Sequence, residues 1–472
     1  MDRLIGLIVR FMVFLSKHFV TYETWDSSQK LKILLVGYNG ARNTGADVRV
    51  VSLVDQIEEL FALESIEISV MTLETEDFGK YFKPHINLIS FSSIFFVDLL
   101  KACSSHHMAI LCEGSTLKSK FANSLTMFFC QAAGIMKAQG KPCLAYGSEA
   151  GDMDPFVSKL AQKLCSDTYF IARTQNSLQV IRELGLKGHL GTDTAWTFES
   201  ESHNSWVRAE LEQYGWNGKK KLIGIAVINP FWWPVRPSLP RLIRSVLTRK
   251  WNLHFQKWYY FSWSKARERS YNAYVEAIAQ AVTDYVDLHD AFPVIIGMEQ
   301  LDDRACVRLQ TLLKEQMIDA PLFVSHSYDG KQLSALLRNL SLLVTSRYHA
   351  HVLSMDAAVP TVAISMDERL TNLVSDIGLR DQLLHHVTDD DLAGKISKSF
   401  SYIDEHVSEV RQALETQVKA SLSLTGDMGY FFVDYVQQAF PGFAGIEQVS
   451  DKSESGYQFE IPRVAQGLPY AG

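Results

Sequence analysis

The segment SLLVTSRYHAHVLSMDAAVP, residues 341–360, holds the side chains that are best placed for catalysis. Ser346, Arg347 and His349 directly follow an apolar run that predicts a strand, and a helical pattern begins with them. Arginine is a fixed cation that binds phosphate or carboxylate, and histidine transfers protons near neutral pH. A histidine in the first turn of a helix lies near the positive end of the helix dipole, which favours its neutral form. We therefore expect anion binding by Arg347 and Ser346 and acid/base chemistry by His349, with a structural histidine as the alternative; His351 is expected to be a packing or surface residue.

A second strand–helix hinge is predicted in TYFIARTQNSLQVIRELG, residues 168–185. Arg173 ends the apolar run, and Ser177 lies in the first turn of the helix that follows. A clamp on an anion and a surface ion pair with a nearby Asp or Glu are both compatible with Arg173. Each charged hydrogen bond to a phosphate oxygen contributes about 1.5–3 kcal/mol, so two arginines can hold a small trianion. We expect Arg173 and Arg347 to meet His349 across a groove.

A glycine-rich turn, GYNGARNTGADVRV, separates a predicted strand at 32–38 from a helical pattern. Gly37, Asn43 and Gly45 let the backbone approach a ligand closely at a helix N-terminus, and Asp47 suits the helix cap and dipole. The spacing matches neither the GxGxxG dinucleotide pattern nor a phosphate loop ending in GK[ST]. A ligand-contacting loop and a purely structural turn both remain open.

Weaker candidates concern an acceptor molecule. Glu113 lies at the end of one predicted strand, Asp193 lies in the segment GTDTAW, and Trp232 and Trp233 belong to an aromatic insertion at 229–270. Such aromatic residues can stack on a sugar face or can pack the insertion onto the protein. Because no His, Cys, Asp or Glu residues show metal-ligand spacing, we expect no metal site.

Composition narrows the class of partner. The chain has 472 residues, and 46 Lys and Arg against 53 Asp and Glu give a net charge of −7. A nucleic-acid-binding protein needs a basic surface, so we expect no nucleic-acid partner. The six cysteines form no CxxC pair and lie in apolar contexts, which favours free thiols in a reducing, cytoplasmic compartment.

The first residues, 1–29, predict an amphipathic helix. Arg10 and Lys17 interrupt the apolar run, so it is too short to span a membrane, and no small-residue cleavage site follows it. Two interpretations remain: a helix packed on the protein, which we favour, and peripheral contact of residues 1–20 with the inner face of a membrane.

Short apolar runs alternate with amphipathic helices of 10–15 residues, which predicts parallel βαβ units. The pattern breaks at 199–221 and then restarts. We therefore expect an α/β fold with two Rossmann-like domains, at 30–198 and 222–390, and a ligand cleft between them, where the carboxyl ends of the strands meet. A helical segment at 391–442 and an extended tail at 443–472 follow. The predicted strands are 32–38, 66–73, 86–91, 107–114, 141–149, 168–173, 221–228, 292–299, 321–326, 341–346 and 360–365.

The motifs, and the order in which they occur along the chain, resemble those of the polysaccharide pyruvyl transferase family. The resemblance rests on N-T-G-A-D at residues 43–47, C-E-G-S at 112–115, R-x-x-x-S at 173–177, the segment around Asp193, and S-R-x-H followed by a strand that begins after Pro360. It covers residues 31–378. The chain departs from the family pattern at Ala46, which is inserted, and at Arg369, where a lysine is more usual.

The resemblance implies two domains arranged as in GT-B glycosyltransferases and transfer of a pyruvyl group from phosphoenolpyruvate to a sugar, forming a ketal. Arg173 and Arg347 would bind the donor, His349 would be the general acid/base, and no cofactor or obligatory metal would be needed. The acceptor would be a sugar of a surface polysaccharide or a lipid-linked glycan. Two alternatives remain: a glycosyltransferase that uses a nucleotide sugar, and a non-catalytic glycan-assembly protein. The first would need an acidic residue in the C-terminal half to hold the ribose, and Asp356 in DAAVP could be misread as that acid.

Overall fold

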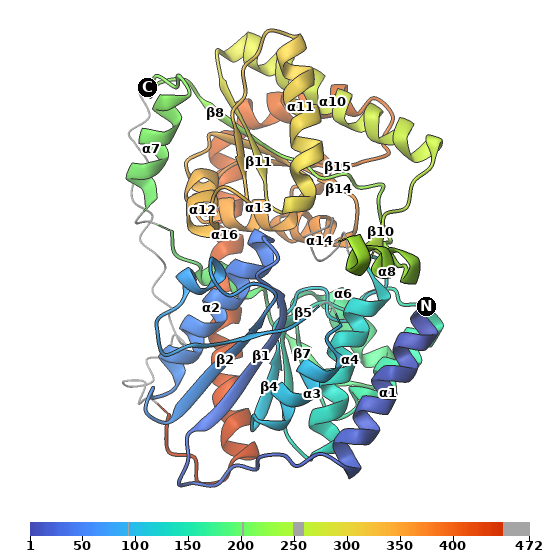
Figure 1. Cartoon of the computed structure of the whole chain (residues 1–472). Helices are drawn as coiled ribbons and strands as arrows, with labels where there is room; N and C mark the ends of the chain where they lie inside the picture. Colours follow the sequence, from blue (N-terminus) through green and yellow to red (C-terminus); the bar gives the residue numbers. More distant parts are fainter. Residues whose placement is uncertain (93, 201–202, 249–258, 447–472) are drawn as a thin grey trace.

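Two parallel sheets divide the chain into an N-terminal and a C-terminal half (Figure 1). The computed structural model describes residues 1–92, 94–200, 203–248 and 259–446. The strand order is β3-β2-β1-β4-β5-β6-β7 in the first sheet and β12-β11-β8-β13-β14-β15 in the second. In both, the first strand of the half lies in the middle and the order reverses beside it, which is the doubly wound arrangement. The predicted pair of Rossmann-like domains is confirmed.

The strands lie close to the predicted positions. Those of the first sheet are β1 (Leu31–Asn39), β2 (Ile66–Thr72), β3 (Asn87–Ser90), β4 (Met108–Leu111), β5 (Cys143–Ser148), β6 (Tyr169–Ala172) and β7 (Lys187–Leu190). Those of the second are β8 (Leu222–Ala226), β11 (Phe292–Gly297), β12 (Leu322–Val324), β13 (Leu342–Thr345), β14 (Thr361–Ser365) and β15 (Leu384–His386). The central strands are almost continuously apolar because helices cover both faces of a parallel sheet. The short edge strands β7 and β15 were not predicted.

Helices connect the strands. The N-terminal half contains α1 (Asp2–His18), α2 (Thr44–Leu60), α3 (Phe96–Ser104), α4 (Asn123–Ala138), α5 (Pro155–Leu164) and α6 (Gln175–Glu183). The C-terminal half contains α7 (Asn204–Gln213), α8 (Leu239–Thr248), α10 (Lys265–His289), α11 (Asp303–Glu315), α12 (Gly330–Arg338), α13 (Tyr348–Met355), α14 (Glu368–Ile377), α15 (Arg380–Leu383) and α16 (Leu392–Ala439). All six cysteines are buried as free thiols.

The N-terminal helix is shorter than the predicted segment 1–29, since α1 ends at His18. One face packs on the protein: Ile5 and Val9 are buried, and Val13 lies against Gly134 of α4. The favoured interpretation of a packed helix is thus correct for this face. Among the described residues, no helix is both long enough and apolar enough to cross a bilayer.

Two further segments differ from simple linkers. The predicted junction at 199–221 contains α7, whose Val207 and Leu211 pack into the core of the C-terminal half. The predicted helical segment at 391–442 is α16, a long helical element with a kink at His406, which runs past both halves (Figure 1). Its first part buries Phe400 in the C-terminal core, and its last part packs Phe432 edge-on against Phe61 of the N-terminal half. The helix therefore joins the two halves.

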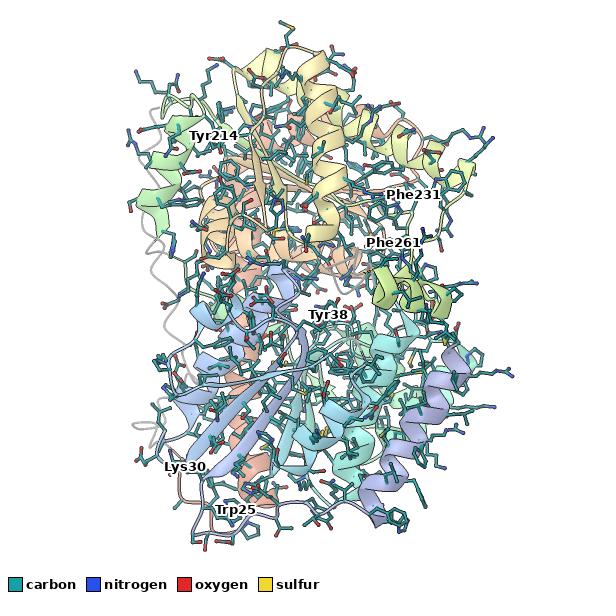
Figure 2. The ribbon with its side chains drawn as sticks, viewed as in Figure 1. Trp25, Lys30, Tyr38, Tyr214, Phe231 and Phe261 are labelled. Carbon is teal, nitrogen blue, oxygen red and sulfur yellow. The ribbon has the colours of Figure 1, made fainter. Side chains whose placement is uncertain are left out.

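The aromatic insertion is described at 229–248 and 259–270, and residues 249–258 lie outside the described residues. It contains α8 and a pair of two-residue strands, β9 (Arg236–Pro237) and β10 (Tyr259–Tyr260), and it overlaps the start of α10 at Lys265. Phe261 lies near the boundary between the halves, where Tyr38 lies on the N-terminal side (Figure 2). Of the tail at 443–472, residues 443–446 are described, and Ile446 pairs with Phe61. The rest of the tail lies outside the described residues.

Candidate functional site

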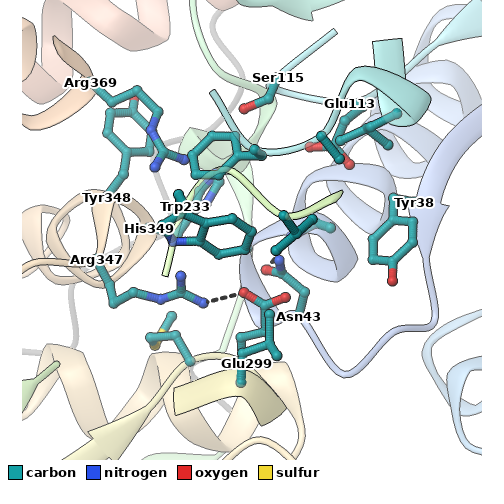
Figure 3. A pocket seen from close by; sticks show the side chains of 18 of the residues that line it. Tyr38, Asn43, Glu113, Ser115, Trp233, Glu299, Arg347, Tyr348, His349 and Arg369 are labelled. Carbon is teal, nitrogen blue, oxygen red and sulfur yellow. Dashed lines mark hydrogen bonds and ion pairs between the residues drawn. The ribbon is translucent and has the colours of Figure 1, made fainter. Parts of the chain in front are cut away.

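A cavity of about 190 Å³ lies between the two halves (Figure 3). The loops that follow β1, β4 and β13 reach it, and in a doubly wound sheet these are the loops at the point where the strand order reverses. One part of its wall is polar: Asn43, Glu113, Ser115, Glu299, Ser346, Arg347, His349 and Arg369. Another is apolar: Phe91, Phe95, Phe121, Leu125, Phe128, Trp233, Val235 and Phe261. The cavity can therefore take a ligand with a charged and an apolar part.

His349 lies in the first turn of α13, as predicted, and reaches across to the N-terminal half. Its Nε2 is buried and lies 3.5 Å from a carboxylate oxygen of Asp193. Its Nδ1 lies directly over Gly45, so closely that a Cβ at this position would collide with the imidazole ring. Burial lowers the pKa of His349 to about 4, against the opposing effect of Asp193. The imidazole is thus neutral at pH 7, and with a proton on Nε2 facing Asp193, Nδ1 has a lone pair for proton transfer.

Asp193 is the centre of a buried ion network. It follows β7 and accepts hydrogen bonds from Arg49 Nε at 2.9 Å, from Arg173 Nη1 at 2.8 Å and from the backbone N–H of Ala195 at 3.0 Å. Burial alone would raise the pKa of Asp193, but Arg49, His349 and Arg173 outweigh it and hold the pKa well below its usual value. The carboxylate stays ionised and fixes the orientation of the imidazole.

Arg173 lies behind the cavity wall and not in the lining. Its side chain is 2% exposed, bonds Glu149 and Asp193, and stacks its guanidinium 4.5 Å from the centre of the Tyr348 ring. Glu149 in turn accepts from Lys118 Nζ at 2.9 Å. Arg173 is thus ion-paired, but in a buried network and not at the surface as the alternative had it, and direct contact of Arg173 with a donor stays a prediction. Ser177 also lies out of the lining; its backbone N–H donates to the hydroxyl of Thr174, the residue that caps α6.

Arg347 does line the cavity. Its Nη2 donates to Glu299 Oε2 at 2.7 Å, and its Nε lies 3.1 Å from Asp302 (Figure 3 shows the first contact). Burial lowers the pKa of Arg347, but Asp302 and Glu299 outweigh it, so the net shift is upward. A guanidinium has five N–H donors, so these two contacts leave others for a ligand. Ser346 also lines the cavity, where its hydroxyl shares a 2.7 Å hydrogen bond with Tyr274.

Arg369 is a second cation of the lining, and it was not among the predicted site residues. It follows β14, bonds Asp367 through Nε at 2.9 Å, and lies 4.7 Å from the centre of the Phe121 ring. Like Arg347, it is part-exposed, with 17% of its side chain accessible. The cavity lining thus contains two guanidinium groups, those of Arg347 and Arg369, together with the imidazole of His349 (Figure 3).

The glycine-rich turn separates into parts with different roles. Gly37 lies inside β1, where a Cβ would meet Cys112, so it is a packing residue and not part of the turn. Asn43 caps α2 by accepting from the N–H of Ala46, and both Asn43 and Gly45 line the cavity. Asp47 is buried away from the cavity and accepts from the N–H of Gly40. Its burial raises its pKa to about 7.

Among the predicted acceptor residues, Glu113 and Trp233 line the cavity, whereas Trp232 and Asp193 are not in the lining. Trp233 lies edge-on to Phe121 with ring centres 5.0 Å apart. Trp232 packs against Phe261 instead. His351 is buried, as one of its two predicted alternatives requires.

Sequence reasoning missed Arg49, Glu149, Glu299 and Arg369. Three of them, Glu149, Glu299 and Arg369, lie shortly after the end of a strand. The same position is the reason that Arg173 and Arg347 were predicted as site residues. Arg49 gave a different signal, since it is a single charge flanked by Val48 and Val50 on a helix face that packs on a sheet. A charge at such a position needs an internal partner, which here is Asp193.

Comparisons with known proteins agree with this architecture. The family model for polysaccharide pyruvyl transferase matches residues 43–368. Among solved structures, a Listeria monocytogenes protein assigned as a UDP-N-acetylglucosamine 2-epimerase is similar with a TM-score of 0.53 at 11% identity, covering 86% of this chain and 97% of that one. A trehalose-phosphate synthase from Burkholderia vietnamiensis is similar with a TM-score of 0.50 at 10% identity, covering 87% and 99%. Neither likeness shows more than the fold. No curated protein matches the sequence.

Proposed function

The chain belongs to the polysaccharide pyruvyl transferase family, and we propose that it moves the enolpyruvyl group of phosphoenolpyruvate onto a sugar of a surface polysaccharide or glycan, where a pyruvate ketal forms. The observation that carries the proposal is the imidazole of His349, 3.5 Å from Asp193, in a cavity that Arg347 and Arg369 also line. Phosphoenolpyruvate is a small anion with a phosphate and a carboxylate, so it suits a cavity with two guanidinium groups and one proton-transferring residue.

Arg347 and Arg369 bind the phosphate and carboxylate of the donor in this proposal. Each already bonds a carboxylate of the protein, which fixes the guanidinium plane before the donor arrives and limits the entropy lost on binding. Arg173 acts through Asp193: it helps to keep the carboxylate ionised, and Asp193 holds His349. Arg173 is then a positioning residue.

The reaction needs two proton movements. His349 Nδ1, which carries a lone pair, accepts the proton of a sugar hydroxyl and delivers it to the methylene carbon of the donor, so that C2 becomes electrophilic and bonds to the hydroxyl oxygen. Phosphate then leaves, and a second hydroxyl of the same sugar closes the ketal ring. The proton of the first hydroxyl thus becomes part of the methyl group, and the proton of the second hydroxyl leaves with phosphate. Neighbouring cations stabilise the phosphate as it departs. No metal or cofactor is called for.

The apolar wall suits the acceptor. Trp233 and Phe261 offer faces on which a sugar ring can stack next to the polar wall. Six free, buried thiols support a reducing, cytoplasmic location for the reaction. Peripheral membrane contact through residues 1–20 is part of the same proposal, and the exposed face of α1 supports it.

The decisive experiment is phosphate release from phosphoenolpyruvate with a panel of glycan acceptors. We expect acceptor-dependent release by the wild type and a loss of about 100- to 10,000-fold in His349→Ala, the usual contribution of general acid/base catalysis. His326→Ala is the matched control, because that imidazole is 45% exposed and lies outside the cavity lining. Release that survives in His349→Ala contradicts the proposal.

The two alternatives make different predictions. A glycosyltransferase would bind nucleotide sugars, and calorimetry with these and with phosphoenolpyruvate compares the two donors directly. Asp356, which could be misread as its ribose-binding acid, lies outside the cavity lining and is bound by Arg338 at 3.1 Å. A non-catalytic assembly protein would support glycan production in cells even as His349→Ala.

A further inference from the structure

The helix α1 has an exposed apolar stripe opposite the face that packs on α4. Leu4, Leu7, Phe11 and Phe14 recur at helical spacing, and their exposed fractions are 51%, 61%, 54% and 51%. Side chains three and four residues apart lie on one face of a helix. A soluble protein rarely exposes such a continuous row of large apolar residues, so the row points to an interaction surface.

A second stripe lies on α8. Leu239, Ile243 and Leu247 are each one helical turn apart and are 44%, 51% and 77% exposed. This helix belongs to the aromatic insertion, whose role the sequence left open. It carries Arg241 and Arg244 and no acidic residue.

The two helices are anchored to the same loop beside the cavity. At the end of the loop between β4 and α4, Asn123, the first residue of α4, donates to Asp2 of α1 with a distance of 2.8 Å. Two residues earlier, the carbonyl of Phe121 accepts from the N–H of Val235, four residues before α8, at 2.9 Å. Figure 1 shows α8 beside the N-terminus of α1. Phe121 and Val235 also line the cavity, so both helices lie next to it.

The charges on the exposed face of α1 indicate what kind of partner the surface binds. The exposed face of α1 carries Arg3, Arg10 and Lys17 among its apolar residues, and its one acid, Asp2, is bonded to Asn123. This cationic surface occurs in a chain whose net charge is −7. Apolar side chains interleaved with Arg and Lys suit the boundary between acyl chains and anionic headgroups. A second copy of the same surface would instead bring like charges together.

We infer that α1 and α8 form one surface, here called the α1–α8 platform, that docks on an anionic lipid bilayer and holds the cavity at the membrane. Docking itself does not depend on the proposed reaction. Given the proposed function, the platform selects acceptors that are attached to the membrane, because these reach a cavity held at the bilayer surface.

Co-sedimentation with vesicles tests the platform. We expect the full chain to bind phosphatidylcholine vesicles that contain phosphatidylglycerol, to bind pure phosphatidylcholine more weakly, and to dissociate as salt screens the charges. The double variant Leu7→Glu/Phe11→Glu and the variant Ile243→Glu should each lower the partition constant at least about tenfold. Leu288→Glu and Met317→Glu are matched controls, since these residues are 78% and 93% exposed and lie outside α1 and α8.

The remaining outcomes separate this partner from others. Arg3→Gln/Arg10→Gln/Lys17→Gln leaves the apolar stripe intact and should remove the preference for phosphatidylglycerol; circular dichroism checks that each variant folds. No vesicle binding by the wild type overturns the inference, and so does equal loss in the control variants. A dimer by light scattering that Leu7→Glu/Phe11→Glu dissolves would mean that a second copy covers the platform. Each readout is independent of phosphate release, so failure of the proposed reaction would leave it unchanged.

Discussion

The two halves use the same kind of residue, a charged side chain just after a parallel strand, in opposite ways. In the N-terminal half, the side chains of Glu149, Arg173 and Asp193 are at most 2% exposed and bind one another. In the C-terminal half, the side chains of Arg347 and Arg369 are 13% and 17% exposed and line the cavity. A charged residue just after a strand is therefore a candidate site residue, and its burial decides its role. The buried network of Glu149, Arg173 and Asp193, here called the frame, supports the site, whereas the part-exposed arginines can contact a ligand.

The difference has an energetic basis. A buried charge costs several kcal/mol unless it is paired and hydrogen-bonded, so removing one member of a buried network exposes that cost in stability. A part-exposed arginine at a cavity keeps water as a substitute partner. We expect substitutions in the frame to change stability first and substitutions in the lining to change activity first.

The largest expected effect is a loss of stability when the buried ion network is disrupted. Asp193→Ala leaves Arg49 and Arg173 without their shared carboxylate, and we expect the free energy of unfolding to fall by about 3–5 kcal/mol. Urea denaturation measures this change. Asp303→Ala is the control, because Asp303 is 33% exposed and pairs with His326 at 3.1 Å; its loss should stay below about 1 kcal/mol. Equal losses would show that the network is not a frame.

The next effect tests the contact between the halves. In Gly45→Ala the new Cβ would collide with the imidazole of His349, and the ring must move because it is enclosed. We expect turnover to fall on the order of 100-fold, as for a comparable displacement of a catalytic group. Steady-state phosphate release measures it. Alanine favours a helix over glycine, so helix propensity does not cost stability. Gly79→Ala, outside the cavity lining, should leave turnover unchanged, and wild-type turnover in Gly45→Ala would separate His349 from the chemistry.

Some features of the two halves can be predicted from short stretches of the sequence, whereas others depend on contacts between residues far apart in the chain. The strands, the first turn of α13 and the place of His349 follow from local apolar runs and from where they end. The cavity position of Arg347 follows in the same way, because it stands directly after β13.

The burial of Arg173 does not follow from local patterns. Its hinge looks like that of Arg347, yet its partners Glu149 and Asp193 come from different strand ends. Only the packing of three loops decides that these groups face one another. The same holds for the cause of the low pKa of His349: the sequence pointed to the helix dipole, whereas burial is the largest cause in the structure. Arg369 was noticed as a departure from a family pattern, and its place in the lining needed the fold.

A smaller effect tests the lining. Arg347→Gln removes charged hydrogen bonds to the donor, and at about 1.5–3 kcal/mol the KM for phosphoenolpyruvate should rise about 10- to 100-fold. Kinetics at saturating acceptor measure this rise. Arg338→Gln is matched in exposure, at 10% against 13%, and in pairing with an aspartate, but Arg338 lies outside the lining. Its KM should not change. An equal rise in both variants would place the donor elsewhere.

The smallest effect concerns His349, where the frame and the lining meet. Its pKa is lowered to about 4 in the folded protein and is about 6.5 in an unfolded chain. Between these values the unfolded chain binds a proton that the folded protein does not, so stability falls as the pH falls through this window. At pH 5.5 this amounts to about 1 kcal/mol relative to neutral pH. His349→Gln should remove that part of the slope in urea denaturation between pH 7 and 5.5, whereas His326→Gln should keep it. An unchanged slope in His349→Gln would mean that the imidazole is protonated beside Asp193, and the frame would then hold a general acid in place of a base.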